Sequence, residues 1–115
     1  MKTLNLTLKK KWFDMIKSGE KLEEYREVKR FWIVRLLSNL EYLTDLSGVQ
    51  SIGPSFKQFD QIIFKNGYSA NAPTITVECL GISIGTAKPE WSDNWQGQVF
   101  VIKLGNIIDP QTQTK

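Results

Sequence analysis

The chain has 115 residues, of which 41% are hydrophobic and 23% charged, and its formal net charge is +3. This balance is typical of one compact globular domain. One cysteine, Cys79, and no histidine exclude an internal disulfide, a zinc site built from cysteine and histidine, and catalysis by an imidazole. Any catalysis would use Lys, Glu, Asp, Tyr, Thr or Ser. We predict no metal site and no cofactor.

The positive charge is concentrated at the start of the chain. Residues 1–35 hold ten Lys and Arg against five Asp and Glu, whereas residues 36–115 hold five against seven. Such asymmetry is compatible with an anionic partner such as nucleic acid, and also with an ordinary solvated surface. No apolar stretch reaches the ~20 residues of a membrane span, and the N-terminus lacks the apolar region of a signal peptide. We therefore expect a cytoplasmic protein with no membrane partner.

The first part of the chain predicts a strand, a helix and an extended segment. Leucines alternate with polar residues over 3–8, the period of a half-buried strand. Apolar residues over 9–18 recur at helical spacing, and Gly19 stands where helices commonly end. Residues 20–26 are polar and are predicted to be extended. A longer helix is predicted from Val28 to about Leu43. Four aromatic residues at helical spacing are expected in the core: Trp12, Phe13, Phe31 and Trp32.

The second half predicts strands separated by loops. Residues 44–58 are rich in turn signals, a strand over 59–65 ends at Asn66-Gly67, and residues 98–104 form the last strand. The apolar residues of a strand over 73–84 change face at Leu80-Gly81, which indicates a bulge. This order differs from regular βαβ alternation and favours an α+β domain with a small, mostly antiparallel β-barrel. We expect one domain over residues 1–108 and a polar tail over 109–115.

The most informative segment is Gly19-Glu20-Lys21-Leu22-Glu23-Glu24-Tyr25-Arg26. If Lys21, Glu24 and Arg26 are buried together, Glu24 and Arg26 hold one another in place while Lys21 faces a cleft. Desolvation there would lower the lysine pKa and make it a usable base or nucleophile. A regular strand would separate Lys21 from the other two, so the arrangement requires an irregular start near Gly19. The alternative is a solvated, charged edge strand.

The segment Gly19-x-Lys21-x-x-Glu24-x-Arg26 resembles the G-x-K-x-x-E-x-R signature of ASCH domains, a family of the PUA-like superfamily. The resemblance, to a small single-domain bacterial or phage-type member, covers residues 3–108, because the motif follows an N-terminal strand and helix and a last strand closes the chain. It implies a PUA-like β-barrel with a cleft beside the motif. In that cleft Lys21, Glu24 and Arg26 would bind RNA or a nucleoside or nucleotide derivative.

The resemblance also implies an enzymatic alternative. Some small bacterial members are amidohydrolases that remove the acetyl group of N4-acetylcytidine, and their lysine aligns with Lys21. Glu24 stands where those enzymes have a threonine, so the catalytic candidates here are Lys21 and Glu24. Glu78 and Glu90 are the candidates for a second carboxylate.

Other residues leave their roles open. Glu78 lies in an apolar run and should meet a cation or face an opening into the ligand site. Tyr68 either is an exposed turn residue or stacks on a base. Trp91 and Trp95 either cover the end of the barrel or hold a ligand. A third functional alternative is a protein-interaction module that uses the loop at 44–58.

Overall fold

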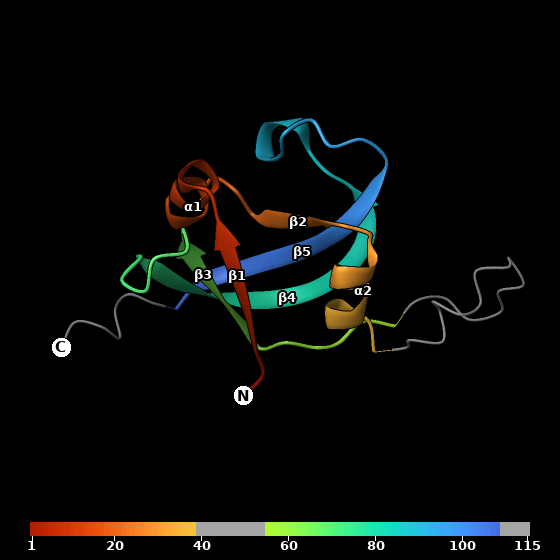
Figure 1. Cartoon of the computed structure of the whole chain (residues 1–115), viewed down its shortest axis with the longest axis horizontal. Coiled ribbons are helices and arrows are strands. Elements are labelled where there is room, and N and C mark those ends of the chain that lie inside the picture. The colour runs from red at the N-terminus through yellow and green to blue at the C-terminus, as the bar shows by residue number, and fades with distance from the viewer. Residues whose placement is uncertain (39–54, 109–115) are drawn as a thin grey trace, which may run out of the picture.

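The computed structural model describes residues 1–38 and 55–108 and has the expected α+β architecture, with two helices beside a curled five-stranded sheet (Figure 1). The helices are α1 (Lys10–Lys17), α2 (Arg30–Leu36) and the short 3-10 helix η1 (Pro89–Trp91). The strands are β1 (Thr3–Leu8), β2 (Glu23–Glu27), β3 (Gln61–Asn66), β4 (Thr74–Thr86) and β5 (Gln98–Ile107). The chain runs from α1 through β2 to α2, so the two helices lie at opposite ends of β2.

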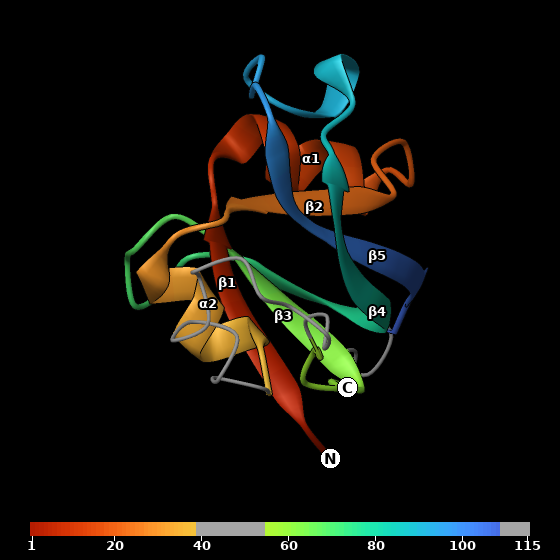
Figure 2. The ribbon, with the colours of Figure 1, turned by 90° about the vertical axis from the view of Figure 1, so that its right-hand side faces the viewer.

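The sheet is an open half-barrel. Its strand order is β1-β3-β4-β5-β2, and β1 pairs with β3 in parallel while the other three pairs are antiparallel. The expected mostly antiparallel sheet is therefore confirmed. Figure 2 shows β4 and β5 bending, so that the sheet curls with β1 and β3 at one end and β2 at the other. In the described residues β1 and β2 form no ladder with each other, so the expected small β-barrel is seen only as a half-barrel.

The curl of the sheet comes from β4. Its register with β5 shifts between Val77 and Cys79 and again between Cys79 and Gly81, and Gly81 has a φ of +144°. A bulge inserts an extra residue into one strand, bends it and increases its twist. The bulge expected from the change of face at Leu80-Gly81 is thus confirmed.

The core lies inside the curl, and α1 packs into it. The leucines of β1 are buried at every second position, as their alternation predicts. Trp12, Phe13 and Ile16 form the buried face of α1. The helix ends at Lys17, and Gly19 follows with a left-handed φ of +87°. Among the described residues, no helix is long and apolar enough to cross a membrane.

The second helix differs from its prediction. The helix expected over 28–43 is α2 and ends at Leu36, and residues 39–43 lie outside the described residues. Leu37 has an extended backbone and bridges to Phe56. Consecutive helical side chains point about 100° apart, whereas Leu36 and Leu37 are both buried. Ending the helix between them lets both enter the core.

Two further expectations concern the same region. Phe31, which was expected in the core, is 50% exposed, because α2 buries Ile33 and Leu36 instead. The loop predicted over 44–58 lies mostly outside the described residues, as does the tail over 109–115. The described chain stops at Ser38 and resumes at Ser55, and the Ser38 amide donates a 2.8 Å hydrogen bond to the Ser55 carbonyl.

Candidate ligand-binding site

The segment from Gly19 to Glu27 has the irregular start that its charges require. After the left-handed turn at Gly19, the Lys21 amide donates to the Met15 carbonyl at 2.9 Å, which holds residue 21 against the end of α1. Strand β2 begins only at Glu23. Lys21 therefore lies before the strand, where side chains need not alternate between the two faces, and its side chain lies on the same side as that of Glu24.

Lys21, Glu24 and Arg26 form a continuous buried chain of ion pairs, here called the ion-pair seam. Lys21 Nζ lies 3.0 Å from Glu24 Oε1, and Arg26 Nη1 donates to Glu24 Oε2. The three side chains are 1%, 5% and 14% exposed in chain order. They are not a solvated edge. Burying a charge costs several kcal/mol unless a partner offsets it, so each member of the seam depends on the others.

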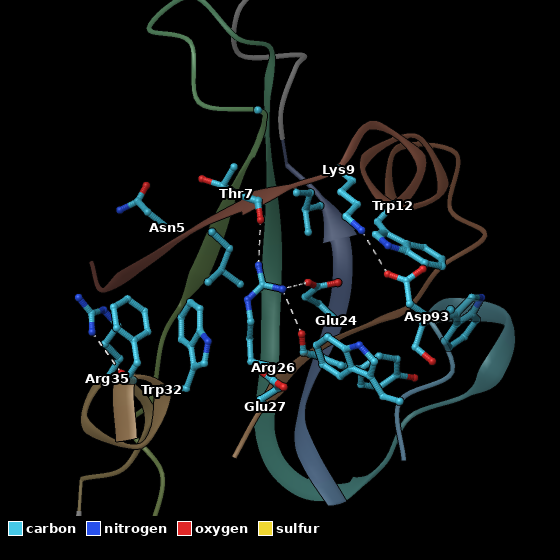
Figure 3. Close-up of a pocket in the computed structure, with 18 of the residues that line it drawn as sticks. Asn5, Thr7, Lys9, Trp12, Glu24, Arg26, Glu27, Trp32, Arg35 and Asp93 are labelled. Atoms are coloured by element: carbon cyan, nitrogen blue, oxygen red, sulfur yellow. Dashed lines mark hydrogen bonds and ion pairs between the residues drawn. The ribbon is translucent and has the colours of Figure 1, made fainter. Parts of the chain in front are cut away.

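The seam also binds main-chain carbonyls of the two edge strands. Lys21 Nζ donates to the Glu23 carbonyl. Arg26 Nη1 donates to the Tyr25 carbonyl at 3.0 Å, and Arg26 Nη2 donates to the Thr7 carbonyl of β1 at 3.0 Å (Figure 3). Arg26 thus ties β2 to β1 across the opening of the half-barrel.

The geometry of β2 explains why these carbonyls need side-chain donors. Main-chain groups of consecutive strand residues point to opposite neighbours. The Leu22 carbonyl accepts a hydrogen bond from the Leu104 amide, so the carbonyls of Glu23 and Tyr25 point away from β5 toward the open edge. The cations of the seam satisfy these acceptors in place of a neighbouring strand.

Burial sets the electrostatics of the seam. Burial lowers the pKa of Lys21, and the adjacent Glu24 opposes this effect without cancelling it. The ammonium also lies 4.8 Å from the ring centre of Tyr25 and 5.4 Å from that of Trp12. Burial, together with the 2.6 Å hydrogen bond from its hydroxyl to Glu23, raises the pKa of Tyr25.

A pocket of about 940 Å³ opens beside the seam. Its walls come from β1 and the start of α1, from β2, from α2, from the turn after β3, and from the segment that follows η1 (Figure 3). The edges of β1 and β2 contribute consecutive residues, 5–9 and 24–27. The pocket therefore occupies the place where a closed barrel would continue its sheet.

The structure brings together some of the residues predicted for the site. Glu24, Arg26 and Tyr68 line the pocket, and Tyr68 is exposed. Lys21 is not among the lining residues, since its side chain is buried in the seam. Glu78 is exposed on β4, also outside the lining, and accepts a hydrogen bond from the Asn106 amide at 3.1 Å.

Carboxylates other than those predicted line the pocket. Glu90 lies in η1 and is exposed, but it does not line the pocket. Glu27 and Asp93 do line it. Asp93 lies 3.5 Å from Lys9 in an exposed ion pair that connects the segment after η1 with the start of α1.

Sequence reasoning missed the wall formed by α2. Phe31, Trp32 and Arg35 line the pocket. The helical spacing of the two aromatic residues predicted core positions, and Trp32 does pack partly buried against the core, whereas Phe31 does not. The Trp32 ring lies 5.1 Å from Arg26 Cζ and meets Phe31 edge to face at 4.9 Å. The sequence did contain a signal for this wall, because Phe31, Trp32 and Arg35 follow closely after the charged segment that ends at Arg26.

Trp91 and Trp95 lie where one end of the sheet meets the pocket. They pack against Tyr25, Val99 and Val101 at one end of the sheet. They also line the pocket. All four tryptophans of the chain, at positions 12, 32, 91 and 95, are therefore lining residues.

Comparison of the chain with protein-family models, with curated proteins and with solved structures finds no match. Membership of the ASCH family accordingly remains a prediction from the motif. In the described part of the chain, no group of three or more cysteine, aspartate and glutamate side chains is arranged to hold a metal ion. The pocket lining itself presents aromatic rings, charged side chains and main-chain groups.

Proposed function

We propose that the chain is an ASCH-type, PUA-like domain whose pocket binds a nucleobase carried by RNA or by a nucleoside or nucleotide derivative. The observation that carries the proposal is the joint presence of many aromatic rings and a carboxylate–guanidinium pair in one pocket. The rings belong to Trp12, Tyr25, Phe31, Trp32, Tyr68, Trp91 and Trp95. Stacking of a base on an aromatic side chain is worth about 1–3 kcal/mol.

The rings of Trp95 and Tyr68 are the best stacking surfaces. Arg26 and Phe31 already contact Trp32, and lysines 11 and 88 lie over Trp12 and Trp91. Within residues 1–38 and 55–108, no ring stacking or cation contact engages Trp95 or Tyr68. Trp95 is half-buried and held by its packing, so it offers the more rigid surface.

The polar groups suit the edge of a base. Glu24 accepts hydrogen bonds, as a base amino group requires, and Arg26 donates, as a carbonyl or ring nitrogen requires. Arg26 Nε is buried and has no hydrogen-bond partner among the described residues. An unsatisfied buried donor costs about 1–3 kcal/mol, and a ligand acceptor would recover this free energy only after the side chains that cover Arg26 Nε move.

The geometry supports binding better than amide hydrolysis. A lysine base or nucleophile must reach the reacting group. The Lys21 ammonium instead donates to Glu24 and to the Glu23 carbonyl and is outside the pocket lining. The interaction-module alternative depends on a loop that lies mostly outside the described residues. The order of the motif after β1 and α1, and the curled sheet beside it, support the PUA-like assignment.

Tryptophan fluorescence offers a direct test, because all four tryptophans line the pocket. We would titrate the protein at fixed salt with ribonucleosides, their monophosphates and single-stranded RNA. We expect saturable quenching and, in Trp95→Ala, at least a fivefold weaker affinity, as loss of a stacking surface implies (~1 kcal/mol). Leu80→Ala, an exposed β4 position outside the pocket, is the matched control and should bind like wild type.

Two results would count against the proposal. One is the absence of saturable quenching with every probe, and the other is wild-type affinity in Trp95→Ala together with Tyr68→Ala. Incubation with N4-acetylcytidine tests the enzymatic alternative, and we expect no release of cytidine. Turnover would show that hydrolysis, rather than binding alone, is the activity.

A further inference from the structure

One cationic side chain of the pocket lining differs from the other charged residues because it has no salt-bridge partner among the described residues. The charged lining residues are Lys9, Glu24, Arg26, Glu27, Arg35 and Asp93. Lys9 pairs with Asp93, Arg26 pairs with Glu24, and Glu27 pairs with the neighbouring lysine 29. Arg35 forms no salt bridge with any carboxylate in the described part of the chain. It is therefore the lining cation whose charge is left for a ligand.

The Arg35 guanidinium is held in place despite its exposure. Its Nη1 donates to the Phe31 carbonyl at 3.1 Å, one helical turn earlier, and its Cζ lies 3.6 Å from the centre of the Phe31 ring. One of its five N–H donors is thus used, and stacking restricts the planar group. Because a planar fork of donors matches the oxygens of a phosphate, a held guanidinium of this kind is suited to bind one.

Arg35 lies at one end of a row of contacts that begins at the seam. Arg26 stacks on Trp32 at 5.1 Å, Trp32 meets Phe31 at 4.9 Å, and Phe31 lies under Arg35. Figure 3 shows Arg35 on the far side of Trp32 from Arg26 and Glu24. For a ligand that places a base against Glu24 and Arg26, this row is a path toward Arg35.

We infer that Arg35 binds the phosphate attached to the nucleoside in the pocket, so that the site prefers a nucleotide to the free nucleoside. This inference rests on the proposed function and assigns Arg35 as its specificity-determining residue. The phosphate is either that of a free nucleotide or a phosphodiester of RNA. Both present the same anionic oxygens, and separate probes distinguish them.

The test compares matched probes on three proteins by tryptophan fluorescence. The probes are the four ribonucleosides, their 5′- and 3′-monophosphates, and a single-stranded oligoribonucleotide without terminal phosphates. The proteins are wild type, Arg35→Gln and Arg30→Gln. Arg30 is exposed on the same helix but does not line the pocket, which makes its variant the matched control. Far-UV circular dichroism verifies that each variant is folded.

Wild type should bind a monophosphate or the oligonucleotide about three- to tenfold more tightly than the nucleoside, the range for an exposed charge-assisted contact. Arg35→Gln should lose this preference and keep its nucleoside affinity, while Arg30→Gln retains both. The slope of log affinity against log salt for the oligonucleotide should fall by about one in Arg35→Gln. Arg35→Lys, which keeps the charge without the fork, should recover part of the preference.

The possible failures are distinguishable. If the nucleosides bind wild type as tightly as every phosphorylated probe, the role of Arg35 is wrong, while the proposed function is unaffected. The same holds if Arg35→Gln keeps the preference, or if Arg30→Gln loses it equally. If no probe binds wild type, both proposals fail. Loss of preference with the monophosphates identifies a nucleotide ligand, and loss with the oligonucleotide alone identifies RNA.

Discussion

Two lysine–carboxylate ion pairs on different sides of the pocket differ mainly in their exposure to water. Lys21 lies 3.0 Å from Glu24, with side chains 1% and 5% exposed, whereas Lys9 lies 3.5 Å from Asp93, with side chains 78% and 53% exposed. Water and salt screen the second pair but reach the first much less. The comparison indicates that removing one partner of the buried pair strands a charge away from water and is costly, whereas removing one partner of the exposed pair at the rim costs little.

The largest expected effect comes from Glu24→Gln, which keeps the side-chain volume and removes the charge between Lys21 and Arg26. Two buried cations then lack their counter-charge, and breaking a buried ion pair in this way costs about 3–5 kcal/mol. Urea denaturation followed by circular dichroism measures this loss of unfolding free energy. Asp93→Asn, at the exposed pair, should cost less than about 1 kcal/mol. Equal losses of unfolding free energy in the two variants would mean that burial does not make one ion pair more important for stability than the other.

A smaller effect is expected from Arg26→Lys. The lysine keeps the charge beside Glu24 but lacks the fork that binds the carbonyls of Tyr25 and Thr7 simultaneously. Leaving these acceptors unsatisfied should cost about 1–3 kcal/mol and speed hydrogen exchange of the β1 and β2 amides relative to those of β4 and β5. The control is Arg30→Lys, the same replacement on the solvent side of α2. A stability equal to that of the control would remove the bridging role of Arg26.

The pH dependence of stability tests the buried lysine alone. Its folded pKa is lowered from 10.5 by burial, so between the lowered pKa and 10.5 the unfolded chain binds a proton that the folded chain has released. Unfolding free energy therefore rises with pH in that window, by at most about 1.4 kcal/mol per pH unit. The wild type should show this rise relative to Lys21→Met, and no Lys21-dependent slope below the window. A difference that falls as pH rises would refute the direction of the shift.

Local patterns predicted the parts of the fold that local forces set. Leucine alternation identified β1, helical spacing before Gly19 identified α1, and the change of face at Leu80-Gly81 identified the bulge of β4. The grouping of Lys21 with Glu24 was also predictable, because Gly19 permits a left-handed turn that few other residues adopt. Each of these features depends on residues close together in the sequence.

The remaining features depend on contacts between distant segments. The end of α2 coincides with the bridge between Leu37 and Phe56. The spacing of apolar residues within α2 does not predict this contact with a distant residue. Arg26 reaches the Thr7 carbonyl, 19 residues away, at the edge where the described strands β1 and β2 form no ladder. The pocket joins β1, β2, α2 and the segment after η1, so the residue spacing within α2 alone could not predict that Phe31 and Trp32 face an opening shared with these elements.

The hydrogen bond between Ser38 and Ser55 and the adjacent bridge from Leu37 to Phe56 give the domain a natural point of insertion. The described chain ends after α2 and resumes before β3 at positions that lie side by side. The entropy of closing such a connection grows slowly with its length. A change in the number of residues between Ser38 and Ser55 should therefore leave the β-sheet and the pocket walls in place.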